Sequence, residues 1–309
     1  MRGNLRPGLL GVITMAGIVL SSPGFGAEPF RYEGVCEASA AAILGERHFA
    51  VASDDTELLT IYERGKAAPV STLRLPAVTD LEAAARIGTT IFWVTSHSLN
   101  QDGEDRTKRK LLFATAVSEN GSLAMTGTTF RSLRERLARL LGRPESVLAT
   151  SLNIEGLAAT PDGHLLVGLR GPLTADGKAQ VVKVDNPFSL VGLPEPARTS
   201  PSLPIATVSR LDLGGRGIRS IDAVGTGERR YLIVAGSVED GGVPPLLYWW
   251  DGLHAATPGP KVSMQGLNPE ALLAWSEREL QIIGDNGDAC SEKAKRNPRW
   301  FPSIDITLD

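Results

Sequence analysis

Five stretches of this chain share one pattern: an acidic residue, a short run of small apolar residues, a turn, and a second apolar run that ends in polar residues. In each stretch the acid stands 12 to 14 residues before an apolar residue of the second run. Such a recurrence indicates a repeated structural unit. The five stretches span residues 36–55, 80–98, 153–171, 219–237 and 268–286.

A third run, apolar or alternating, follows each stretch and is typical of a strand. The third runs begin at Leu58, Lys110, Ala179, Pro245 and Ser303. Several modules add a fourth run, and these begin at Val70, Ala206 and Lys261. Four short antiparallel strands per module of about 45 to 70 residues predict an all-β fold, a β-propeller with five blades. Six blades remain the alternative, because the long second and third modules have room for a degenerate one.

The two ends of the chain complete this pattern. The last module stops after its third run, whereas the strand-like run FRYEG from Phe30 belongs to no module. We therefore expect the strand at Phe30 to become the fourth strand of the last blade and to close the ring.

Composition excludes other classes of protein. The 309 residues include 33 Gly and 20 Pro, so the chain is rich in turns and a helical bundle is disfavoured. The formal net charge is −3, which provides no basic excess for a nucleic-acid backbone.

The first 27 residues have the form of a secretory signal peptide. Arg2 and Arg6 precede an apolar run over residues 9–20, and the small residues of SSPGFGA then end at Ala27. A membrane anchor is the alternative, but the run is shorter than the ~20 residues that a span needs. We expect a signal peptide over 1–27 and one propeller domain over 28–309, periplasmic or secreted, without membrane attachment and monomeric.

The chain has two cysteines, Cys36 and Cys290. An even number of cysteines in an oxidising compartment predicts a disulfide between them, beside the expected ring closure. Two buried free thiols are the alternative. A zinc site is disfavoured, since the four histidines are scattered along the chain.

One segment breaks the strand pattern. Residues 130–145 place leucines at helical spacing, with five arginines around them, and predict a helix near 131–142 inserted between blades. The helix is interpreted either as a lid or basic surface for an anionic partner, or as an element packed on the propeller with a solvated arginine face.

The repeat also predicts where polar side chains gather. In a propeller the first strand of each blade lines the central channel, and the second returns to the same mouth. The repeated acids should therefore form a ring at that mouth, and they are Glu37, Glu82, Glu155, Asp222 and Glu270. The second strands bring Asp54, Asp55, Ser96, His97, Arg170, Ser237, Asp285 and Asn286 to the same place.

A ring of carboxylates cannot stay ionised and unpaired in a narrow channel. The ring can be relieved by pairing to Arg170, Arg219 or backbone amides, by partial protonation, or by a bound hard cation, for which oxygen ligands and export suit calcium. Each acid can also serve only to cap its own blade.

Three residues of this mouth differ between modules and are the candidate catalytic group. His97 is interpreted as a general base or phosphate ligand, or as a hydrogen-bonded loop histidine. Arg170 can clamp an anion or neutralise Glu155. Asp285 completes the group. The sequence motifs of serine esterases, nucleotide-binding folds and zinc proteases do not occur in the chain.

The stretches DLEAAA, WVTSHSLNQDGE, NIEGLAATPDG, LLVGLRGPL, GIRSIDAV, NPEALLA and IIGDNGD resemble a bacterial family of exported propellers that carries a domain-of-unknown-function designation. The acidic strand starts also resemble, more distantly, the esterase-like phytase propellers. That second resemblance implies calcium held around the channel and binding of phosphate esters. A lysine-rich substrate cluster at matching positions is not evident in this sequence.

The function expected is binding of a small anionic ligand at the channel mouth, with calcium-dependent hydrolysis of a phosphate ester or a lactone. In that scheme Glu82, Glu155 and Glu270 hold the metal, His97 moves the proton and Arg170 holds the anion. The alternative is a noncatalytic propeller that presents its loops to a protein or glycan partner.

Overall fold

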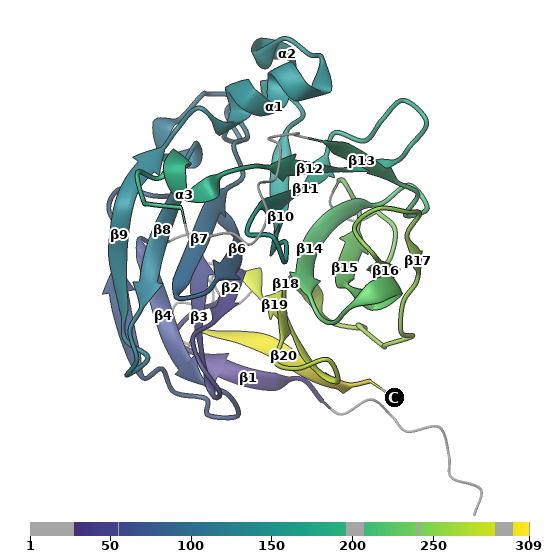
Figure 1. The fold of residues 1–309 in the computed structure, drawn as a ribbon. Coiled ribbons are helices and arrows are strands. Elements are labelled where there is room, and N and C mark those ends of the chain that lie inside the picture. Colours follow the sequence, from purple (N-terminus) through teal and green to yellow (C-terminus); the bar gives the residue numbers. More distant parts are fainter. Residues whose placement is uncertain (1–27, 55, 196–206, 240–241, 288–298, 309) are drawn as a thin grey trace, which may run out of the picture.

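The computed structural model describes residues 28–54, 56–195, 207–239, 242–287 and 299–308. In this part of the chain the strands form five antiparallel sheets of four strands each, arranged as blades around a central channel (Figure 1). The predicted all-β, five-bladed propeller is confirmed.

Blades 1 to 4 each consist of four strands that are consecutive in the sequence. Blade 1 contains β2 (Ala38–Ile43), β3 (His48–Ser53), β4 (Leu58–Glu63) and β5 (Ser71–Arg74). Blade 2 contains β6 (Leu81–Ile87), β7 (Thr90–Thr95), β8 (Leu112–Val117) and β9 (Leu123–Phe130). Blade 3 contains β10 (Asn153–Ala159), β11 (Leu165–Gly171), β12 (Ala179–Val184) and β13 (Val208–Leu211). Blade 4 contains β14 (Gly217–Ala223), β15 (Tyr231–Gly236), β16 (Leu246–Trp250) and β17 (Thr257–Pro258).

Blade 5 joins the two ends of the chain. It contains β18 (Asn268–Ala274), β19 (Glu279–Asp285), β20 (Trp300–Thr307) and, as its outer strand, β1 (Phe30–Glu33). The pairing of β1 with β20 is antiparallel and sets Phe30 opposite Ser303. The expected ring closure by the strand at Phe30 is thus confirmed.

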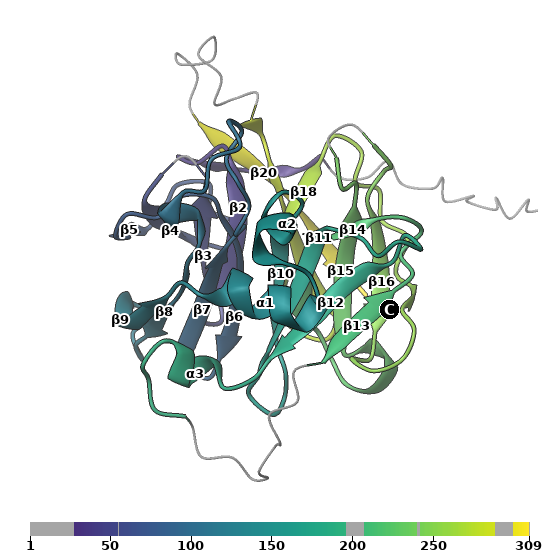
Figure 2. The same cartoon turned by 90° about the horizontal axis from the view of Figure 1, so that it is seen from above.

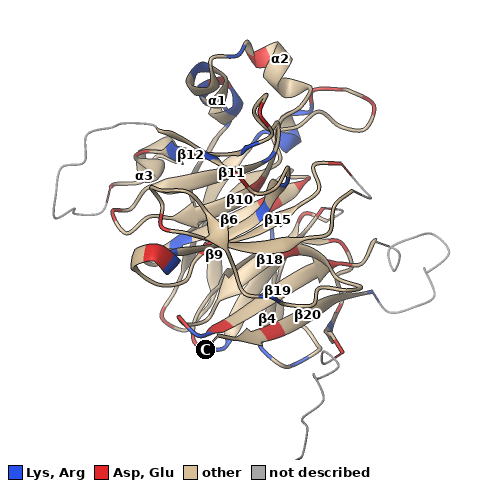
Figure 3. Ribbon diagram, turned by 90° about the vertical axis from the view of Figure 1, so that its right-hand side faces the viewer, with Lys and Arg blue, Asp and Glu red and all other residues tan. Residues whose placement is uncertain are grey.

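The helices are short and lie outside the blades. They are α1 (Leu133–Leu141), α2 (Glu145–Ala149) and α3 (Pro187–Leu190), with 3-10 turns at Thr107–Arg109 and Gly227–Arg229. The predicted inserted helix is α1, which packs between blades 2 and 3 (Figure 2). Basic residues recur along its ribbon in Figure 3: Arg131, Arg136 and Arg139 are exposed, as expected for a helix packed on the propeller with a solvated arginine face, whereas Arg134 is buried.

The apolar core is divided among the blade interfaces. Five clusters of buried side chains each fill the space between two neighbouring blades. Successive side chains of each strand point to opposite faces of the sheet. One face of each sheet packs against the blade before it and the other against the blade after it, which explains this division.

One strand prediction was wrong. The run that begins at Lys261 is not a strand, and the fourth strand of blade 4 is the two-residue β17. Gly259 and Pro260 follow β17, and Pro260 has no backbone N–H to donate to the ladder, so the pairing ends there.

Two other predictions fall outside the described residues, as does Asp55, one of the side chains expected at the mouth. The signal peptide over 1–27 is one of them. The second is the disulfide, because Cys290 lies in the range that is not described; Cys36 is buried, and its carbonyl oxygen accepts a hydrogen bond from the Asn286 N–H at 2.8 Å. In the described residues, no helix has the length and apolar character that crossing a membrane requires.

Candidate functional site

Each inner strand breaks its pairing register near its first residues. In four blades the break leaves one residue without a partner on the second strand, and these residues are Glu82, Glu155, Arg219 and Glu270. In blade 1 the break spans Ser39 and Ala40. Such a β-bulge re-aims a side chain, and here it brings the four charged side chains to one mouth of the channel. We call this end the acidic mouth.

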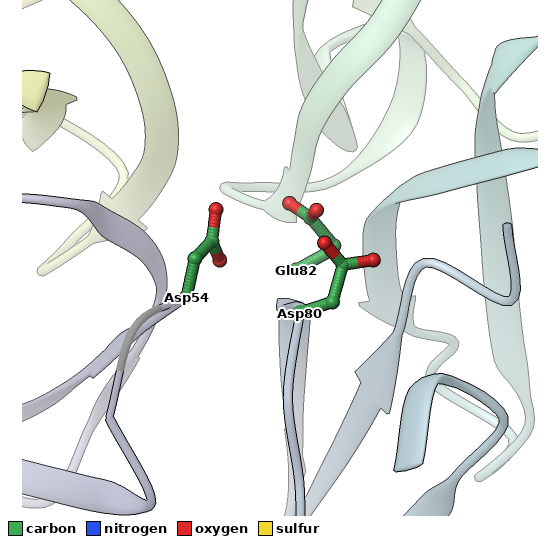
Figure 4. Close-up of side chains that lie close together, drawn as sticks. All are labelled: Asp54, Asp80 and Glu82. Atoms are coloured by element: carbon green, nitrogen blue, oxygen red, sulfur yellow. The ribbon is translucent and has the colours of Figure 1, made fainter. Parts of the chain in front are cut away.

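Three carboxylates of blades 1 and 2 face one another at the acidic mouth. Asp54 follows β3, Asp80 precedes β6 and Glu82 lies in β6. One oxygen from each lies within 4.8 Å of the other two. Figure 4 shows Asp80 and Glu82 side by side, with Asp54 across the gap from them on the neighbouring blade. Asp80 has a left-handed backbone (φ 62°), a conformation that aspartate tolerates better than most residues. We call these three residues the acid cluster.

Few groups neutralise the acid cluster. The Arg109 guanidinium lies 2.5 Å from Asp80 Oδ2, and the Ser96 hydroxyl donates to the same oxygen. No described residue forms a hydrogen bond or an ion pair with the Glu82 side chain, which is only 8% exposed. The Oδ1 atom of Asp54 is also buried, and no described residue donates to it.

Burial and mutual repulsion raise the pKa values of these carboxyl groups. Burial, with the nearby Asp80 charge, raises the pKa of Asp54 to about 8. Burial raises the pKa of Glu82 well above its ordinary value, with repulsion from Asp54 and Glu155. Burial also raises the pKa of Asp80, although Arg109 opposes the shift. Without a cation the acid cluster therefore retains protons near neutral pH.

Arginine partners relieve the carboxylates of blades 3 to 5 at the same mouth. Glu155 accepts a hydrogen bond from Arg170 at 2.9 Å and lies 3.3 Å from Arg219 Nε. Arg219 also pairs with Glu270. Asn268 donates to Glu270 at 3.0 Å and to Asp285 at 3.3 Å. The acidic mouth thus has an acid-rich side and a side where acids and arginines alternate.

The alternating side contains a pocket of about 280 Å³. Its polar lining residues are Arg170, Arg219, Ser237, Glu239 and Asn268, and apolar residues of the neighbouring loops complete it. The side chains of Arg170 and Arg219 are 13% and 9% exposed, respectively. Because both are largely desolvated and already held in place by Glu155, they can receive an anion without a large loss of side-chain freedom. We call this the arginine pocket.

The remaining predicted residues occupy different places. Glu37 lies at the acidic mouth, where it contributes to the raised pKa of Asp54. Asp285 lies there too, and burial raises its pKa. His97 is fully buried beside Arg134, and neither ring nitrogen has a hydrogen-bond partner in the described part of the chain. Burial, with repulsion from Arg134, lowers the pKa of His97 to about 3, so the imidazole is neutral.

The expected ring was wrong at Asp222. This residue lies near the end of β14, at the opposite mouth of the channel, and accepts hydrogen bonds from the Ala223 N–H at 2.8 Å and the Ala274 N–H at 2.9 Å. The bulge residue of blade 4 is Arg219. The repeat pattern took the acid of each stretch as equivalent and so matched Asp222 with Glu155. The bulge positions show that Arg219 is the residue equivalent to Glu155.

Arg219 was expected as a partner of the ring carboxylates, and it pairs with Glu155 and Glu270. Three residues of the mouth were not assigned to a site from the sequence, and they are Asp80, Arg109 and Asn268. Asp80 and Asn268 are the first residues of two repeated stretches, and this shared position was a signal that could have found them. Arg109 had no such signal, because the long loop after β7 brings it back to the mouth.

No protein-family model matches the chain, and no curated protein matches it. Among solved structures, it is similar to the glutaminyl cyclase of Myxococcus xanthus, with 12% identity, 92% of this chain and 97% of that chain covered, and a TM-score of 0.49. It is also similar to the PQQ-bound aldose sugar dehydrogenase of Streptomyces coelicolor, with 13% identity, 89% and 96% covered, and a TM-score of 0.41. The two family resemblances seen in the sequence stay expectations.

Proposed function

We propose that the acidic mouth binds a divalent cation at Asp54, Asp80 and Glu82 and a small anionic ligand in the adjoining arginine pocket. The observation that carries the proposal is the acid cluster itself: three carboxylate oxygens within 4.8 Å of one another, one of them on a Glu82 side chain that pairs with no described residue. A buried, unpaired carboxylate is costly, and a cation would remove this cost.

Calcium suits this donor set best. All three side chains offer oxygen, which hard cations prefer. Three oxygens within 4.8 Å of one another are close enough to share one calcium ion, which binds oxygen at about 2.3–2.6 Å. The nearby Glu37 and solvent can complete the six to eight ligands that calcium takes. The export expected from residues 1–27 would expose the site to extracellular calcium.

Glu155 and Glu270 are less suited to the ligand role expected for them, because both already pair with arginine. Their ion pairs support a positioning role, in which they fix Arg170 and Arg219 beside the cation. A small ligand could then place its anionic group in the arginine pocket and a second oxygen on the cation. The reaction this supports is hydrolysis of a phosphate ester or a lactone, in which water adds and the ester bond breaks.

The first test is calcium binding by calorimetry. We expect wild-type protein to bind calcium, and Glu82→Gln to weaken the affinity at least tenfold, because one carboxylate ligand is lost. The matched control is Asp102→Asn, which removes an exposed acid of the loop after β7 and should leave the affinity unchanged. Equal affinities of wild type and Glu82→Gln would contradict the proposed cation site.

The second test separates catalysis from binding. Release of p-nitrophenol from its phosphate ester and opening of a small lactone are followed with calcium and with chelator. If wild-type protein hydrolyses either substrate and Glu82→Gln does not, the result supports the hydrolase function. Calcium binding without turnover would favour the noncatalytic alternative, in which the mouth and its loops present a surface to a partner.

A further inference from the structure

The channel has a second opening with a different chemistry. A cavity of about 300 Å³ lies where the five inner strands end. Each inner strand contributes an alanine to its wall, namely Ala42, Ala84, Ala159, Ala223 and Ala274. Larger apolar residues line it as well, namely Ile43, Leu272, Leu273 and Trp275, and the small alanines leave space between them. We call this space the lower cavity.

One carboxylate faces the lower cavity without a counter-ion. Asp222 lines the cavity, and no described residue forms an ion pair with it. Its Oδ1 accepts the Ala223 N–H and its Oδ2 the Ala274 N–H, so the carboxylate is held in a fixed position between β14 and β18. Each oxygen keeps capacity for a further donor, since a carboxylate offers about four acceptor sites.

The other charged side chains of the lower cavity do not neutralise Asp222. The Arg86 guanidinium donates to the carbonyl oxygens of Gly88 at 2.7 Å and Ile43 at 3.1 Å, and its side chain is at the exposed rim. Glu46 is also exposed. Burial raises the pKa of Asp222 to about 7, with no charged neighbour among the causes. The half-buried Asp222 carboxylate therefore lines a cavity with room for a cationic partner.

We propose that the lower cavity binds a small primary amine in its ammonium form, with the ammonium group at Asp222 and a short apolar chain along the alanines. The volume lies at the small end of ligand pockets, which fits a molecule of a few carbon atoms. Apolar walls would remove the chain from water, and the fixed carboxylate would accept the N–H groups. This site is separate from the acidic mouth.

The test uses n-butylammonium as probe and 1-butanol as its neutral counterpart, with binding measured by saturation-transfer NMR on the full chain. We expect butylammonium to bind in the millimolar range and at least tenfold more tightly than butanol. Asp222→Asn should weaken ammonium binding at least tenfold while the calcium affinity of the acidic mouth stays unchanged. Equal binding of the two probes, or no binding of butylammonium, would overturn the proposal.

A second variant tests the place of binding. Ala84→Leu fills the cavity and should abolish butylammonium binding, whereas Ala116→Leu, at a half-buried strand alanine of the same blade outside the cavity, should leave it unchanged. If butylammonium bound folded Ala84→Leu as well as wild type, the lower cavity would not be the site. Where Ala84→Leu does not fold, Asp222→Asn still decides, because it adds no volume.

Discussion

The carboxyl group of Asp222, at the lower cavity, makes the stability of the protein depend on pH. Burial raises the folded-state pKa of Asp222 from 3.8 to about 7. Between these two values the folded protein holds a proton that the unfolded chain releases. The contribution of Asp222 to the free energy of unfolding therefore falls as the pH rises from about 4 to about 7.

Asp222→Asn removes this dependence. We expect the stability of the variant to decline less than that of wild type between pH 4 and pH 7, because its amide does not titrate. Urea denaturation at pH 4, 5.5 and 7 measures the difference between the two slopes. The raised pKa values of the acid cluster act in the same direction in both proteins, so they cancel in the comparison. Parallel profiles would show that Asp222 titrates normally.

At the scale of elements, α1 ties the loop after β7 to the propeller through one buried arginine. The Arg134 side chain is 5% exposed and binds Asp105 through both terminal nitrogens, at 3.0 and 2.7 Å, and Glu145 of α2 at 3.1 Å. The hydrogen bonds from Arg134 lower the pKa of Asp105 to about 2. The contribution of this ion pair to stability is therefore complete above about pH 4, the ordinary pKa of aspartate, and is lost as the pH falls towards 2.

Removal of that arginine should loosen the whole insertion. We expect Arg134→Met to cost about 1–3 kcal/mol, less than a fully buried pair would, because Asp105 and Glu145 are 43% and 44% exposed. Arg139→Met is the control: it breaks an exposed pair with Glu135 one turn away and should cost less than about 0.5 kcal/mol. Urea denaturation compares the two. A similar cost for both would show that α1 is held by its leucines alone.

At the scale of the whole molecule, the ring depends on the seam between blades 5 and 1. Tyr32 of β1 is buried there, with its ring centroid 5.1 Å from that of Phe301 and 5.2 Å from that of Phe49. Its hydroxyl accepts hydrogen bonds from the Gly65 N–H and the Gln281 side chain. One side chain of a four-residue strand thus joins the first and last blades.

Tyr32→Ala should therefore destabilise the complete propeller, by about 3–5 kcal/mol as for other large buried aromatics. Phe30→Ala, two residues away on the same strand and 40% exposed, is the matched control and should cost about 1 kcal/mol or less. Measurements under reducing conditions remove any contribution of the predicted Cys36–Cys290 bond. Equal effects of the two variants would show that the seam is not closed by this packing.

The sequence by itself determined the repeat and hence the blades. Strand period, turn residues and the spacing of the repeated acids are local properties, and they predicted five blades, the closing strand at Phe30 and the inserted helix. They also predicted that Glu82, Glu155 and Glu270 reach one mouth, because neighbouring modules place equivalent residues at equivalent positions.

Only the tertiary structure decided which charges meet. The bulges set the register, and a shift of a few residues exchanged Arg219 for Asp222 at the acidic mouth. Asp54 and Asp80 come from different blades, and the sequence alone does not reveal that they lie close together. Charge interactions depend on separation and burial across the channel, which the packing of all five blades creates. The same packing placed Asp222 at the lower cavity, away from the acidic mouth.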